Sequence, residues 1–170
     1  MVKLIACIGP NGELGKDNDL VYSNKEDMNF FRKTTLKSIV IMGWNTFKSL
    51  GSKPLPKRLN VVLSPEDLDA EGIIQFKDKT LEEAIEFLKN MNPVYDLYII
   101  GVAYVYNEAI RLSLADELLL TVMYDSVDAD VFVDMDAIED NYKITRMLDH
   151  VKEDGKEVGR IVQFERRWQK

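Results

Sequence analysis

Cysteine and histidine are nearly absent from this sequence. Cys7 is the single cysteine and His150 the single histidine among the 170 residues. One cysteine cannot form an internal disulfide, and one residue of each kind cannot assemble a Cys/His metal centre. We therefore expect no disulfide framework and no metal site, and we predict a reducing, cytoplasmic compartment for the chain.

The chain also has fewer basic than acidic side chains. It contains 22 lysines and arginines against 29 aspartates and glutamates, which gives a formal net charge of −7. General nucleic-acid binders and anionic-membrane binders need a basic surface to gain free energy from counterion release. We therefore expect neither partner, and an anionic small-molecule ligand would have to meet a local cluster of positive charge.

Long hydrophobic runs are missing as well. The longest largely uncharged stretch, residues 97–109, is interrupted by Asn107 and Glu108. It is shorter than the roughly 20 apolar residues that a membrane helix requires. The apolar residues 1–8 stop at the turn-forming residues 9–12, too early for a secretory signal. We expect an N-terminal strand there and no membrane partner.

The composition that remains is typical of one soluble globular domain. With 46% hydrophobic and 30% charged residues the chain can bury a sizeable core, and we predict a single domain over residues 1–170. Short apolar runs rich in valine and isoleucine are interpreted as buried strands. They cover residues 2–8, 38–42, 59–63, 73–76, 95–100 and 116–124.

Helical segments alternate with these runs. They are expected to start after Ser23, near Trp44, at Thr80 and after Gly101. Ser23 and Thr80 are each followed three residues later by glutamate, which is the spacing of a capping box. The alternation predicts an α/β fold with a mostly parallel central sheet flanked by helices.

The C-terminal part follows a different pattern. Apolar residues alternate with polar ones over residues 142–148 and 162–168, and residues 153–156 have the composition of a tight turn. We predict an antiparallel C-terminal hairpin, with Trp168 on its second strand. The acidic segment 125–140 is interpreted as a solvated loop, because its carboxylates lack the regular spacing of a calcium loop.

Asp27 is an acid in the first turn of a predicted helix whose neighbours Met28, Phe30 and Phe31 are apolar. It can be an ordinary N-terminal acid that the helix dipole stabilises in water. If it faces a pocket, the helix terminus lowers its pKa and the apolar surroundings raise it. Such a carboxylate can bind a nitrogen heterocycle through paired hydrogen bonds and help to deliver a proton to it.

Several short motifs follow one another in a fixed order. An Ile-Ala pair stands in the first strand, a strand over residues 40–43 ends in Ile-Met-Gly, and residues 54–60 read Pro-Leu-Pro-x-Arg-x-Asn. The chain resembles the dihydrofolate reductase family in these motifs. The further matches are Gly15, Asn18, Asp27, Phe31, Thr35, Thr46, Ser49, Gly51, residues 99–101, Val105, Tyr106, residues 115–118 and Thr121.

The resemblance implies a function for the first half of the chain. The family reduces 7,8-dihydrofolate to 5,6,7,8-tetrahydrofolate for thymidylate, purine and one-carbon metabolism. Asp27, with Thr121 near it, would hold the pteridine and assist protonation of N5, and Tyr22 would bind a water near the substrate. Arg58 would fork onto the α-carboxylate of the substrate's glutamate. The apolar slot would be lined by Ile5, Ala6, Met28, Phe31, Leu50, Leu55 and Ile100.

The resemblance also implies a nicotinamide dinucleotide, NADPH, as cofactor. Helix starts after Gly43 and Gly101 would present backbone amides to its phosphates. The expected cofactor-binding residues are Cys7, Leu14, Asn18, Gly43, Trp44, Asn45, Thr46, Leu63, Ser64, Gly101, Val102, Ala103 and Tyr106.

Three features of the sequence depart from the family pattern. Both prolines usual in the loop before Asp27 are missing, which should leave that loop less preorganised. Trp44 replaces the basic residue that grips the 2′-phosphate, so we predict weaker discrimination against NADH, with Lys48 or Lys77 as substitute bases. Val102 replaces the second glycine of a Gly-Gly pair, and a β-branched residue there is expected to lower the affinity for the cofactor.

Two alternatives stay open beside the reductase. One is a related reductase of the same fold that acts on a ribosylated pyrimidine, as in riboflavin synthesis. Asp27, Phe31 and Arg58 favour a folate instead. The other is a non-catalytic or weakly active folate- or nucleotide-binding homologue, which the changes at Trp44 and Val102 keep possible. We expect a monomer whose partners are small molecules.

Overall fold

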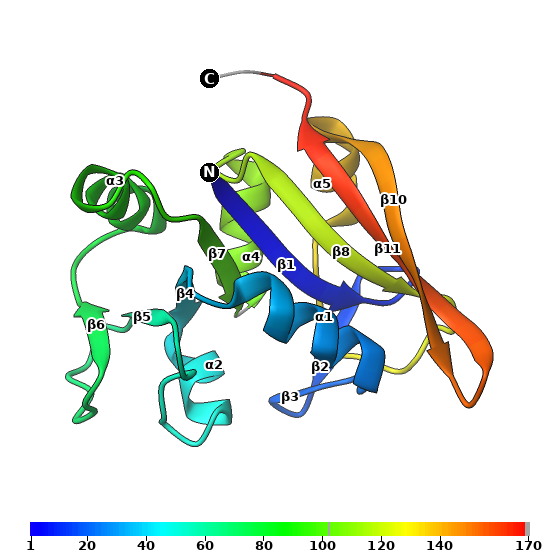
Figure 1. Cartoon of the computed structure of the whole chain (residues 1–170), viewed down its shortest axis with the longest axis horizontal. Helices are drawn as coiled ribbons and strands as arrows, with labels where there is room; N and C mark the ends of the chain where they lie inside the picture. The colour runs from blue at the N-terminus through cyan, green and yellow to red at the C-terminus, as the bar shows by residue number, and fades with distance from the viewer. Residues whose placement is uncertain (102, 169–170) are drawn as a thin grey trace.

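A central sheet of eight strands forms the body of the protein (Figure 1). A computed structural model describes residues 1–101 and 103–168. The strand order is β10-β11-β8-β1-β7-β4-β5-β6. These strands are β1 (Val2–Ile8), β4 (Ile39–Gly43), β5 (Leu59–Leu63), β6 (Ile73–Phe76), β7 (Leu97–Gly101), β8 (Glu117–Met123), β10 (Tyr142–Glu153) and β11 (Lys156–Arg166).

Six neighbouring strands of this sheet are parallel, and the last two are antiparallel. β1 pairs in parallel with both β7 and β8, and β4 pairs in parallel with β5 and β7. β11 runs antiparallel to β8 and to β10. Asp154 and Gly155 both have positive φ, 51° and 78°, as a tight two-residue hairpin turn requires. The predicted α/β class and C-terminal hairpin are confirmed.

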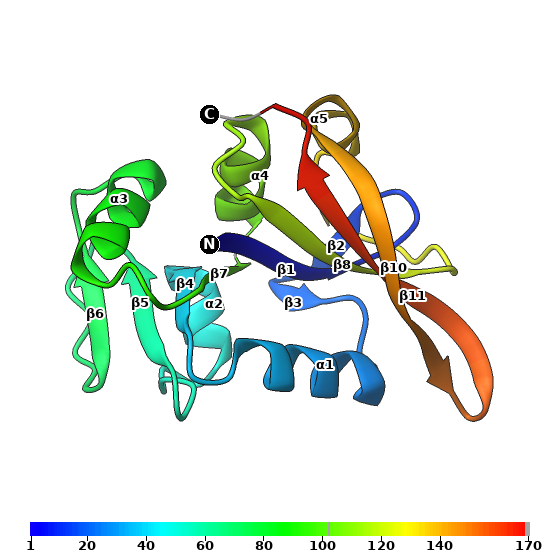
Figure 2. The same ribbon diagram turned by 45° about the horizontal axis from the view of Figure 1, so that its top comes forward.

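Helices cover both faces of the sheet (Figure 2). Side chains of α1 (Lys25–Thr35) and α2 (Trp44–Ser49) pack on one face. Side chains of α3 (Leu81–Met91), α4 (Ala103–Arg111) and α5 (Met135–Asn141) pack on the other. Alternation along each strand divides the core accordingly, because Val40 and Met42 face α1 and α2 whereas Ile39 and Ile41 face α3 and α4.

Three expectations about local structure are corrected. α1 is capped by Asn24 and not by Ser23, because the Asn24 side chain accepts from the amide of Asp27 at 2.9 Å. The acidic segment 125–140 is not a continuous loop, since it contains a short strand and α5, whose N-cap is Asp134. Trp168 lies beyond the end of β11 and is exposed. The capping box at Thr80 is present as predicted.

A second, small sheet lies beside the carboxyl end of β1. It consists of β3 (Asp19–Leu20), β2 (Glu13–Lys16) and β9 (Val131–Phe132), in that order. β2 pairs antiparallel with both neighbours, so the segment before α1 is tied to the segment after β8. Among the helices that the structure describes, none has the length and hydropathy to cross a membrane.

Candidate functional site

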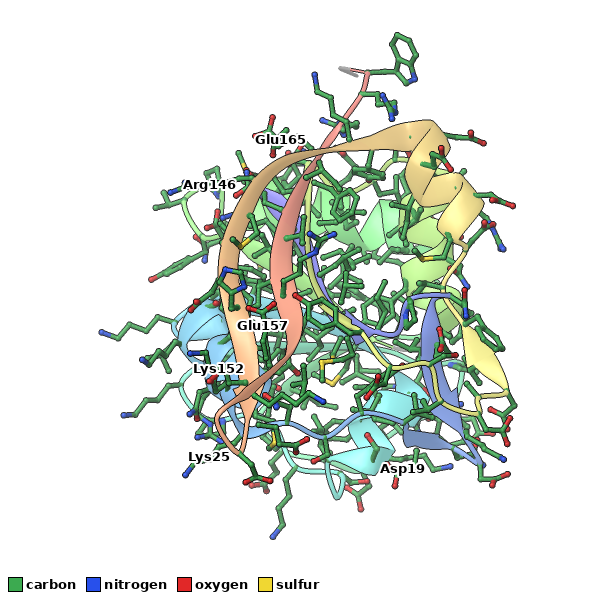
Figure 3. The ribbon with its side chains drawn as sticks, turned by 90° about the vertical axis from the view of Figure 1, so that its right-hand side faces the viewer. Asp19, Lys25, Arg146, Lys152, Glu157 and Glu165 are labelled. Atoms are coloured by element: carbon green, nitrogen blue, oxygen red, sulfur yellow. The ribbon has the colours of Figure 1, made fainter. Side chains whose placement is uncertain are left out.

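The first turn of α1 is fixed from two sides. Its cap, Asn24, is buried and also donates through Nδ2 to the carbonyl of Lys152 at 3.2 Å. The amide of Lys152 in turn donates to Glu26 at 3.1 Å. Figure 3 shows Lys152 on the hairpin, with Lys25 of α1 near the same end of the molecule. The hairpin therefore holds in place the turn that carries Asp27.

The Asp27 carboxylate lies against the sheet. Cys7 of β1 and Thr121 of β8 are paired in the parallel register, so their side chains stand next to each other on the face below α1. The thiol and the hydroxyl both lie close enough to the Asp27 carboxyl to lower its pKa. Burial has the larger effect and raises the pKa of Asp27 above its ordinary value, and these two polar neighbours offset part of the rise.

The surroundings of Cys7 decide the ionisation state of its thiol. It is only partly buried, and its thiol meets a carboxylate. Burial first, and then the charge of Asp27, raise the pKa of Cys7. The thiol therefore stays protonated next to Asp27, which disfavours a role as a nucleophile.

The predicted apolar slot is largely one cluster of side chains. Ile5 and Ile100 are buried on the α1 face of the sheet, and Phe31, Leu50 and Leu55 pack against them. Cys7 shares this face with Ile5 because the two residues are two positions apart on one strand. Asp27 is thus at one end of an apolar surface.

Two expected lining residues lie elsewhere. Ala6 points to the opposite face of the sheet and belongs to the core under α4. Met28 lies on α1 but is half exposed.

Arg58 is held rigidly at the other end of this surface. Its Nε donates to the Thr35 hydroxyl at 2.9 Å, and its two terminal nitrogens donate to the carbonyls of Pro56 at 2.6 Å and Arg32 at 2.9 Å. Each terminal nitrogen carries a second N–H group that can bind a ligand carboxylate. Lys57 lines a cleft together with Arg58, so two positive charges lie close together around this arginine. An anionic ligand needs such a local cluster because the chain as a whole is negatively charged.

The expected cofactor residues meet at the carboxyl edge of the parallel strands. Gly43 at the end of β4 pairs with Leu63 of β5, and Met42 pairs with Gly101 of β7. Gly101 has φ +143°, and a Cβ atom on it would lie 2.4 Å from the hydroxyl oxygen of Thr46. Both its backbone and its surroundings therefore require glycine. Ligands of open α/β sheets bind at this edge.

Trp44 carries a lysine on its ring. The Nζ of Lys48 lies 3.9 Å from the centroid of the indole, one helical turn further along α2. Lys77, the other candidate base, is paired with Asp67 at 3.1 Å. The structure thus places a positive charge beside Trp44, although the residue at that position is itself uncharged.

The remaining expected cofactor residues fall into two groups. Leu14, Ser64 and Tyr106 are buried, and Tyr106 donates its hydroxyl to the carbonyl of Ile5 at 2.9 Å. Asn18 and Asn45 are exposed, and Ala103 is partly buried at the start of α4. Val102 lies outside the described residues.

The side chains of Tyr22 and Glu13 both lie next to Gly9. The Tyr22 hydroxyl donates to the carbonyl of Asp125 at 2.8 Å. A Cβ atom on Gly9 would lie 2.1 Å from this hydroxyl oxygen and 2.7 Å from Oε1 of Glu13. Glu13 was not among the expected site residues. Its one signal in the sequence is that an acidic residue stands directly before the apolar Leu14.

Comparison with known proteins decides the family. A family model described as dihydrofolate reductase matches residues 1–166. The chain belongs to the dihydrofolate reductase family. This membership confirms the resemblance that the sequence motifs indicated, together with the enzyme family expected from it.

Curated dihydrofolate reductases show the same relationship over most of their length. The protein from Ureaplasma parvum is 35% identical over 136 residues, which cover 80% of this chain and 83% of the relative. The protein from Haemophilus influenzae is 36% identical over 129 residues, 76% of each chain. A solved dihydrofolate reductase from Enterococcus faecalis, complexed with NADP(H) and RAB-propyl, superimposes with a TM-score of 0.81 at 22% identity, covering 98% of this chain and 96% of that one.

Proposed function

We propose that this chain reduces 7,8-dihydrofolate to 5,6,7,8-tetrahydrofolate with hydride from NADPH. The observation that carries the proposal is the half-buried Asp27 carboxyl, which lies beside Thr121 and Cys7 at the end of an apolar surface. A carboxyl in this setting can pair with a pteridine's amino group and N3. Its raised pKa increases the fraction that is protonated near neutral pH, which suits assistance to proton delivery at N5.

The two ends of the apolar surface match the two ends of the substrate. Asp27 meets the pteridine, and the ring system and the aminobenzoyl group lie along Ile5, Phe31 and Leu55. Arg58 binds the α-carboxylate of the glutamate with the two N–H groups that its protein partners leave for a ligand. Because these partners fix the guanidinium, little side-chain entropy is lost on binding.

The carboxyl edge of the sheet fits a dinucleotide. Gly101 lets backbone approach the ligand closely, because any larger side chain would fill the space between it and Thr46. Gly43 ends the neighbouring strand β4. When bound, the nicotinamide ring supplies the hydride. Trp44 and Lys48 offer an aromatic face and a positive charge, which suit the adenosine part and its 2′-phosphate. The chain orients the two ligands and excludes water.

The test is loss of NADPH absorbance when dihydrofolate is added to the purified chain. Steady turnover supports the proposal. No turnover with either NADPH or NADH would contradict it and leave a non-catalytic binding homologue, and turnover of a ribosylated pyrimidine alone would assign the chain to the other reductase class.

We also propose that the enzyme works as a monomer in the cytoplasm without a nucleic-acid partner. One copy of the chain can supply Asp27, Arg58 and Gly101. A net charge of −7 disfavours polyanions, and the free thiol beside Asp27 suits a reducing compartment. Light scattering after size exclusion should give a mass near 19.6 kDa, and twice that mass would contradict the proposal.

A further inference from the structure

Among residues 1–101 and 103–168, Glu13 is the one acidic or basic residue whose side chain is buried. Its exposed fraction is 1%. It begins β2, between the loop after β1 and the rest of the segment that leads to α1. The proposed chemistry does not use this carboxylate. A buried charge lowers stability unless hydrogen bonds compensate for lost water. Glu13 therefore needs a structural or functional reason.

The carboxylate of Glu13 joins two segments that are far apart in the sequence. Its Oε1 accepts from the amide of Asn11 at 2.6 Å, within its own segment. Its Oε2 accepts from the hydroxyl of Ser126 at 2.6 Å and from the amide of Val127 at 3.3 Å, in the segment after β8. Burial alone would raise the pKa of Glu13, but these hydrogen bonds outweigh it and hold the pKa below its ordinary value. The group is ionised at neutral pH.

The same carboxylate stands beside the Tyr22 hydroxyl. Both groups rest on Gly9, where a Cβ atom would collide with either of them. Tyr22 donates its single hydroxyl proton to Asp125, so its oxygen can only accept further hydrogen bonds. Burial, followed by the charge of Glu13, raises the pKa of Tyr22 to about 12, which keeps the hydroxyl neutral.

Tyr22 is linked to the catalytic carboxyl through Cys7. Cys7 is close enough to affect the pKa of Tyr22, and its thiol also lies beside the Asp27 carboxyl. The charged and titratable groups around Cys7 are therefore Glu13 and Asp125 on the side of Tyr22, and Asp27 and the buried Tyr106 on the other side.

We propose that Glu13 is a positioning residue for the reaction, which holds residues 9–24 against residues 125–127 and fixes the Tyr22 hydroxyl as an acceptor beside Cys7. The inference rests on the proposed reductase function. Glu13 does not touch the substrate. It acts through Tyr22, whose hydroxyl oxygen can accept a hydrogen bond from a water molecule. That water can in turn assist proton delivery to N5 of the substrate.

The test uses Glu13→Gln, which keeps the shape and removes the charge. The side-chain amide of the glutamine can donate a hydrogen bond to the hydroxyl oxygen of Tyr22. It then competes with the water near the substrate for the lone pairs of that oxygen. We expect kcat to fall about tenfold while KM for dihydrofolate changes less than about threefold. Lys16→Gln is the matched control, because it breaks an exposed ion pair with Asp128 between the same segments, and its kcat should stay within about twofold.

A double-mutant cycle separates positioning from general loosening. In a Tyr22→Phe background, Glu13→Gln should cause no further fall in kcat, because the route through the hydroxyl is already lost. Additive losses would overturn the inference. Should Glu13→Gln not fold, Ser126→Ala serves instead, since it removes one hydrogen bond to the carboxylate from an exposed position, and its smaller loss should likewise vanish in Tyr22→Phe.

A ligand-free measurement keeps the two proposals apart. Amide hydrogen exchange of Asn11 and Val127 should be faster in Glu13→Gln than in the wild type, and unchanged in Lys16→Gln. Equal protection in all three proteins would contradict the inference whatever the activity. Failure of the wild type to reduce dihydrofolate would instead contradict the proposed function.

Discussion

The substrate side and the cofactor side of the candidate site are built from different materials. Around Asp27 and Arg58 the functional groups are side chains, and hydrogen bonds fix the first turn of α1 and the guanidinium group. At Gly43 and Gly101 the chain has no side chain, and a Cβ atom on Gly101 would collide with Thr46. A side-chain site depends on residue identity, whereas a backbone site depends on shape and tolerates change wherever no Cβ enters it. This difference explains why the family pattern is followed closely on one side and loosely on the other.

The largest effect is expected on the substrate side. Asp27→Asn keeps the shape of the side chain and removes its ability to supply a proton. We expect kcat at pH 7 to fall by about a hundredfold or more. Stopped-flow measurement of NADPH oxidation would check this, and near-wild-type turnover would assign proton delivery to another group.

The same variant tests the pKa of Asp27. A carboxyl whose pKa is raised on folding binds its proton more tightly in the folded state, so stability falls as pH rises from the unfolded value of 3.8 through the folded pKa. Above that window Asp27→Asn should unfold at higher urea than the wild type, and below it the difference should disappear. Equal midpoints at neutral pH would mean that Asp27 is not desolvated.

Arg58→Lys should weaken the other end of the substrate site. Lysine keeps the charge but cannot form the three hydrogen bonds that fix the guanidinium or the fork onto a carboxylate. We expect KM for dihydrofolate to rise about tenfold or more, with kcat nearly unchanged. A substrate analogue without the glutamate should show no difference between the two proteins.

Gly101→Ala is the corresponding change on the cofactor side. The added Cβ would meet the Thr46 hydroxyl at 2.4 Å, in a backbone conformation that disfavours a side chain. We expect a loss of about 1–3 kcal/mol in stability and a several-fold rise in Kd for NADPH, with dihydrofolate binding little changed. Calorimetry of each ligand separately gives the comparison. Adding Thr46→Ala should restore part of the stability, because it removes the collision and leaves only the backbone strain.

The smallest effect is expected at Lys48. Lys48→Met removes the charge above the Trp44 ring, so the preference for NADPH over NADH should fall by about three- to fivefold. Lys77→Met, which breaks an exposed pair with Asp67, is the control and should leave the ratio unchanged. A preference that depends on Lys77 instead would move the phosphate site away from α2.

Local patterns were sufficient for several parts of the molecule. The capping box at Thr80, the turn at Asp154 and Gly155 and the early acid Asp27 all depend on residues close together in the sequence. Their free energies are decided within a few residues, so the pattern alone predicts them. The same locality misled at Ser23, where Asn24 became the cap because the hairpin binds it from a distant part of the chain.

The sequence by itself therefore determined the order of the central-sheet strands and of the first four helices, the family and the acid at the head of α1. Only the tertiary structure decided that Cys7 and Thr121 stand together below Asp27, that α5 forms within the acidic segment, and that Glu13 is buried between two loops. Strand register and burial are set by contacts between residues more than a hundred positions apart, as the hydrogen bond between Ser126 and Glu13 shows. Neither the hydrophobic periodicity nor the helix and strand propensity of a short segment predicts contacts between residues so far apart in the sequence.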